Sequence, residues 1–82
     1  MNDLPVNIQV FIKTLPADKQ AKAIDIALHE YQDASISHLE WTFYNSNGKT
    51  YDLKEADVVG WDVAFEHLKE WVACYQTLER MN

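Results

Sequence analysis

The apolar residues near the start of the chain recur with the spacing of a helix. Val6 and Val10 lie one turn apart, and Pro5 stands where a first helical turn tolerates its missing N–H. We therefore expect a first helix over about residues 5–13. It should end before Pro16, because the residue that precedes a proline avoids the α conformation.

A second and stronger helical pattern begins at that proline. The segment ADKQAKAIDIALHEYQ is rich in residues that favour helices. Its apolar members fall on one side of a helix: Ala17, Ala21, Ile24, Leu28 and Tyr31. This predicts a helix over about residues 16–33. The stretch Ala34-Ser35-Ile36-Ser37 lacks the pattern, so we expect the helix to end before it.

From His38 to Tyr44 the apolar and polar residues alternate, which is typical of a half-buried strand. Asn47-Gly48 follows, and this dipeptide is a strong signal for the turn of a β-hairpin. We expect an antiparallel hairpin over about residues 38–54. A three-residue turn gives the register that pairs apolar residues and would bury one face, consisting of Trp41, Phe43, Tyr51 and Leu53.

The last apolar stripe is the longest, and it predicts a helix over about residues 58–80 with Asp57 as its cap. The stripe contains Trp61, Ala64, Phe65, Leu68, Trp71, Val72, Tyr75 and Leu78. Together these elements predict an α+β fold in the order α-α-β-β-α, with one hairpin packed on helices. A chain of 82 residues has the size of one domain, residues 1–82.

The charge of the chain is unevenly distributed. The net charge is −6, and residues 30–82 contain ten acidic residues and four basic ones, so they carry all of it. Proteins that bind nucleic acid need Lys and Arg to replace the counterions of the phosphates. We therefore expect no direct binding to nucleic acid, and a protein partner with a basic surface instead.

Cysteine content and hydropathy indicate where the chain works. Cys74 is the only cysteine, so an intrachain disulfide is excluded and a reducing compartment is favoured. No apolar run reaches the length of a membrane span, and the first residues lack the pattern of a signal peptide. The sequence thus predicts a cytoplasmic protein without a membrane segment.

The best candidate site is an acidic ridge on the last helix, formed by Asp62, Glu66 and Glu70 at positions i, i+4 and i+8. Asp57 extends it toward the helix start, and Tyr44, on the outer side of the predicted hairpin, adds an aromatic anchor. Two interpretations are open: a docking surface for a basic partner, or a solvated face that keeps a small protein soluble.

Catalytic chemistry finds little support. His67 and Cys74 lie on one helix with neighbouring glutamates, but a metal site needs three or four ligands and no third segment supplies one. Ser35, Ser37 and Ser46 have no His and Asp at a recognisable spacing, and the two glycines are too isolated for a phosphate loop. We expect no enzyme activity, no metal and no cofactor.

These observations favour a small acidic interaction protein, such as an inhibitor, an immunity-type protein or a phage antagonist of a nuclease, that binds and occludes its partner. The alternative is a structural homodimer or accessory subunit joined through apolar helix faces. It is motivated by the first helix, which is apolar around more than half of its circumference, with Val6, Ile8, Val10, Phe11 and Ile12.

Overall fold

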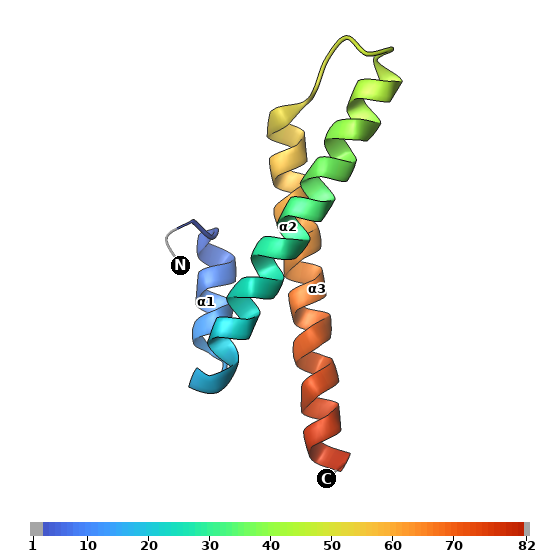
Figure 1. Cartoon of the computed structure of the whole chain (residues 1–82). Helices are drawn as coiled ribbons and strands as arrows, with labels where there is room; N and C mark the ends of the chain where they lie inside the picture. Colours follow the sequence, from blue (N-terminus) through green and yellow to red (C-terminus); the bar gives the residue numbers. More distant parts are fainter. Residues whose placement is uncertain (1–2, 82) are drawn as a thin grey trace.

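The computed structural model describes residues 3–81, and these residues form three helices and no strand. Helix α1 comprises Val6–Lys13, α2 comprises Ala17–Asn45 and α3 comprises Leu53–Met81. The two long helices run antiparallel and cross each other, and α1 packs beside one half of the pair (Figure 1). The fold is all-α, and the predicted α+β class is wrong.

The predicted β-hairpin over residues 38–54 is absent, because its first strand continues α2. The Thr42 hydroxyl donates to the His38 carbonyl at 2.8 Å, and the Ser46 N–H donates to the Thr42 carbonyl at 3.0 Å, as in a helix. No proline or glycine interrupts residues 17–47. Leu39 and Phe43, which an alternating pattern places on one face, are also one helical turn apart.

The Asn-Gly dipeptide ends α2 instead of turning a hairpin. Asn47 has φ 59° and Gly48 has φ 77°, so both are left-handed. The Gly48 N–H donates to the Phe43 carbonyl at 2.8 Å, which closes the last helical turn. Two residues with positive φ suit a tight hairpin turn and a helix end alike, which explains why the signal misled.

The start of α3 also differs from the prediction. Asp52, and not Asp57, accepts a side-chain hydrogen bond from the helix start: its Oδ1 receives the Glu55 N–H at 2.9 Å. The helix therefore begins five residues earlier than predicted, at Leu53. One contact of the predicted hairpin survives in another form, since the rings of Phe43 and Tyr51 stack at 4.8 Å across the connection.

Small residues let the two long helices approach each other closely. Along α3, every fourth residue from Ala56 to Val72 is buried: Ala56, Gly60, Ala64, Leu68 and Val72. Ala23 and Ala27 are the buried residues of α2. Buried positions four residues apart on both helices correspond to the commonest way in which helix ridges fit into grooves, and that packing crosses the two helix axes.

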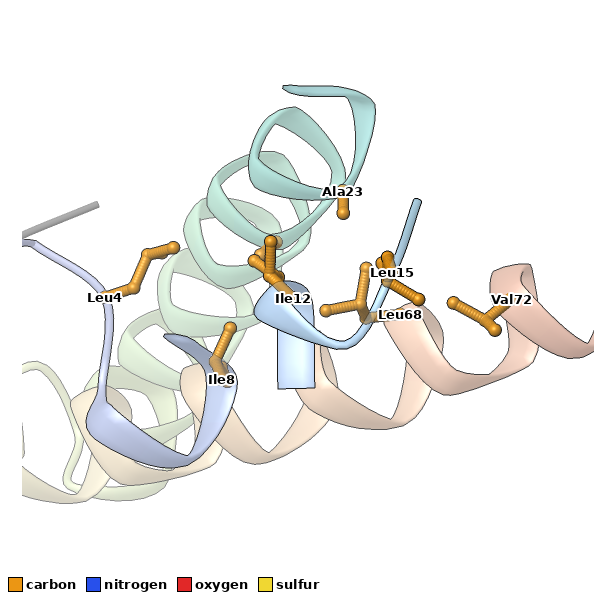
Figure 2. Close-up of a cluster of buried hydrophobic side chains, with 8 residues drawn as sticks. Leu4, Ile8, Ile12, Leu15, Ala23, Leu68 and Val72 are labelled. Carbon is orange, nitrogen blue, oxygen red and sulfur yellow. The ribbon is translucent and has the colours of Figure 1, made fainter. Parts of the chain in front are cut away.

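The core lies where α1 meets the two long helices. Ile8 and Ile12 of α1 and Leu68 of α3 are its largest fully buried side chains. Leu4 and Leu15, at the two ends of α1, complete the cluster together with Ala23, Ala27 and Val72 (Figure 2). Because α1 is only eight residues long, it packs against only one half of the α2–α3 pair, and the core is confined to that half (Figure 1).

Candidate functional site

The three carboxylates of the acidic ridge share one side of α3. Asp62, Glu66 and Glu70 are all exposed, and their positions lie opposite the buried seam that contains Ala64. Lys69 bonds to Glu66 at 2.9 Å and neutralises part of the negative charge. A straight helix carries these residues over about 12 Å, since each residue adds about 1.5 Å.

The structure turns Asp57 away from this ridge. Asp57 lies two turns before Ala64, so it faces α2, where its Oδ1 accepts a hydrogen bond from the Tyr31 hydroxyl. Tyr44 is 76% exposed near the end of α2, not on a sheet. Of the five residues predicted as one surface, the structure groups Asp62, Glu66 and Glu70 and sets Asp57 and Tyr44 apart.

A groove that the sequence reasoning missed lies between α2 and α3, beyond the start of α1. Tyr31 and Trp61 stack there with their ring centroids 3.9 Å apart. The groove is open to solvent and has a volume of about 630 Å³. The other lining residues are Asp3, Leu28, His29, Gln32 and Asp57. The sequence analysis assigned Tyr31 and Trp61 to the apolar stripes of two different helices. The one sequence signal for a close approach of these helices is Gly60, next to Trp61, because glycine lacks a Cβ.

The Tyr31 hydroxyl is held in its protonated form. Its hydrogen bond to the Asp57 carboxylate, helped by partial burial and by the negative charge of that carboxylate, raises the pKa of Tyr31 above its ordinary value of 10.0. A phenolate at this position would lose the donated bond and would be repelled by Asp57.

This raised pKa gives the stability a defined dependence on pH. The folded chain binds the Tyr31 proton more tightly than the unfolded chain, so the stabilisation is complete below pH 10.0 and is lost as pH rises through the higher folded-state value. We expect Tyr31→Phe to remove this loss above pH 10.0, measured by urea unfolding across that range. Equal alkaline destabilisation in both proteins would contradict the assignment.

Histidine–carboxylate pairs join the two long helices. His67 Nδ1 of α3 lies 2.6 Å from Glu30 Oε2 of α2, and His38 Nε2 lies 3.6 Å from Glu55 Oε2. Within residues 3–81, no three His, Cys, Asp or Glu residues are placed to hold a metal ion. The His67–Glu30 contact is within hydrogen-bonding distance and links α3 to α2, whereas the His38–Glu55 contact is too long for a hydrogen bond. Cys74, which the sequence analysis considered beside His67, is exposed and forms no disulfide in the described structure.

In the part of the chain that the structure describes, no helix combines the length and apolar character that a membrane span requires. The chain matches no protein-family model, no curated protein and no solved structure.

Proposed function

We propose that the chain is a cytoplasmic, non-enzymatic interaction module that binds a protein partner with a basic surface and occludes it. The observation that supports this proposal is the ridge of Asp62, Glu66 and Glu70, exposed together on one side of α3. Nucleic-acid-handling proteins are the partner class that this charge suits best, because their binding grooves are basic.

The physical basis is electrostatic complementarity. Helix α3 is anchored to the core through Leu68 and Val72, so the ridge is presented on a fixed scaffold. A fixed row of like charges steers an oppositely charged partner and sets its orientation. The net charge of −6 adds long-range attraction to the same partner and weakens any direct association with nucleic acid. Salt should weaken this binding, because the charges are exposed and screened.

Charge reversal on the ridge tests the proposal. We expect Asp62→Lys/Glu66→Lys to weaken binding to the partner by at least about tenfold, or about 1.4 kcal/mol. Immobilised wild type and variant are incubated with host lysate at low salt, washed with rising salt, and the retained proteins are identified by mass. A captured basic protein is then titrated against both proteins to obtain its dissociation constant.

The matched control is Asp25→Lys/Asp33→Lys, which changes the net charge equally at two exposed positions of α2. It should keep most of the affinity, because the local ridge is intact. If the ridge variant binds as tightly as this control, the ridge is only a solvated face and the proposal fails.

A further inference from the structure

Helix α1 is apolar on two opposite sides. Its inner side carries Ile8 and Ile12, both fully buried against α2 and α3. Val6 lies two residues before Ile8, and Val10 two residues before Ile12, so both valines point to the opposite side of the helix. Val6 is 74% exposed and Val10 is 57% exposed. A helix with apolar residues on both sides is characteristically packed between two layers. The described residues of one copy supply only the inner layer.

The crossed pair is apolar on the side where α1 lies, and this apolar surface continues beyond the start of α1. On α3, Val58, Trp61 and Phe65 share this side at i, i+3 and i+7, and Phe65 contacts Phe11 of α1 with ring centroids 5.4 Å apart. Val58 itself is 60% exposed. The groove of Asp3, Leu28 and Trp61 marks the point where the cover by α1 stops.

Helix α2 continues this surface with an uncharged stripe. Leu28 lines the groove, and Ile36, Leu39 and Phe43 follow at spacings that keep them on the same side. Ile36 is 54% exposed. The positions on this side carry no charge from Leu28 to Phe43: Leu28, Gln32, Ser35, Ile36, Leu39 and Phe43. Ser35 packs near Gly60 and Phe43 stacks on Tyr51, so the chain itself covers these two. We call the exposed apolar residues Leu28, Ile36 and Val58 the uncovered stripe.

The molecular surface is larger than that of a compact monomer of the same mass. The accessible surface is 5792 Å². A compact monomer of 9.5 kDa would expose about 5,050 Å². The difference of about 750 Å² is close to the roughly 800 Å² that each partner buries in a standard interface. The radius of gyration of 15.1 Å likewise exceeds the value of about 11.7 Å for a compact chain of this length.

We propose that a second copy of this chain covers the uncovered stripe, in a two-fold symmetric dimer. Each α1 lies between the two crossed pairs, with its inner side on its own core and Val6 and Val10 on the partner's stripe. Eight residues span about 12 Å, whereas the 29 residues of α2 span about 44 Å, so a second short helix has room beside the first. A two-fold axis makes both contacts equivalent.

This dimer does not depend on the proposed partner binding. Glu66 and Glu70 lie on the side of α3 away from the stripe, so both copies would keep them exposed, whereas Asp62 follows Val58 by one turn and borders the stripe. The response to salt separates the two associations. Two copies of charge −6 repel each other while apolar surface holds them, so the dimer should tighten as salt rises. Binding of a basic partner should weaken.

Sedimentation equilibrium tests the dimer. We expect wild type to be dimeric at micromolar concentration, and Val10→Glu and Ile36→Glu each to weaken the dimer by at least about tenfold. Both residues are exposed in one copy, so these changes spare its core. The control Leu78→Glu alters an equally exposed residue of α3 outside the stripe, and it should dimerise like wild type.

A wild type that stays monomeric at high micromolar concentration and high salt overturns the dimer, whether or not the variants fold. A dimer that persists unchanged in both variants overturns the assigned interface. Partner binding is measured separately, so a monomer that still captures a basic protein contradicts only the dimer. A dimer that captures none contradicts only the proposed function.

Discussion

Replacing Leu68 by alanine is expected to lower the free energy of unfolding by about 2–5 kcal/mol, the range for removing a buried leucine side chain. Leu68 is fully buried where α1 meets the crossed pair, and among residues 3–81 only Ile8 and Ile12 are comparably large and equally buried. The surrounding positions are held by three helices and can close the cavity only in part. Small domains have total stabilities of about 5–15 kcal/mol, so this one change removes a large part of the total.

Urea unfolding followed by circular dichroism measures the effect, with both proteins at the same concentration because self-association would add to the apparent stability. Leu78→Ala is the matched control on the same helix, since Leu78 is 57% exposed. It should change the stability by less than about 0.5 kcal/mol. Similar losses in the two variants would mean that Leu68 is not in the core.

The second large effect is expected at Gly60, where alanine should destabilise the chain despite its better helix propensity. An added Cβ would lie 2.7 Å from Tyr31 Cδ2 and 3.1 Å from Ser35 Cβ. The Tyr31 ring cannot easily yield, because it is stacked on Trp61 and bonded to Asp57. Overpacking lowers the stability by about 1–3 kcal/mol, whereas the better helix propensity of alanine raises it by about 1 kcal/mol. We therefore expect a net loss of stability.

A double-mutant cycle distinguishes this clash from a general intolerance of α3. In the Tyr31→Ala background most of the obstruction is gone, so Gly60→Ala should become neutral or stabilising. Urea unfolding of wild type, the two single variants and the double variant gives the coupling energy, which should be at least about 1 kcal/mol for residues in contact. Additive effects would show that Gly60 does not serve the packing of Tyr31.

The sequence predicted the helical parts of this fold because their signals are local. Pro5 and Pro16 mark helix starts, and the apolar stripe through Trp61 and Leu68 has a clear helical period. The segment of residues 38–45 misled because its signals are ambiguous. Trp, Thr, Phe and Tyr favour strands, yet no residue there breaks a helix, and contacts with α3 and Tyr51 override the weak propensity.

The candidate surface was predictable only where residue spacing within one helix determines which residues lie together. Asp62, Glu66 and Glu70 share a side of α3 by spacing alone. Asp57 was expected to cap the helix and extend the ridge, but α3 begins earlier and the spacing then places Asp57 on another side than Asp62. Its contact with Tyr31, 26 residues earlier in the chain, depends on how α2 crosses α3. The groove around Tyr31 and Trp61 depends on the same crossing. Tyr44 was misplaced along with the hairpin that was expected to present it.

The central claim is that α2 continues as one helix through Tyr44, because this continuity aligns Leu28, Ile36 and Phe43 and excludes a hairpin. The most direct test is nuclear magnetic resonance of the isotope-labelled chain, with Cα chemical shifts and proton contacts for residues 38–45. We expect positive Cα secondary shifts and contacts between residues i and i+3. Negative shifts with cross-strand contacts between Trp41 and Leu53 would contradict the fold and the dimer interface derived from it.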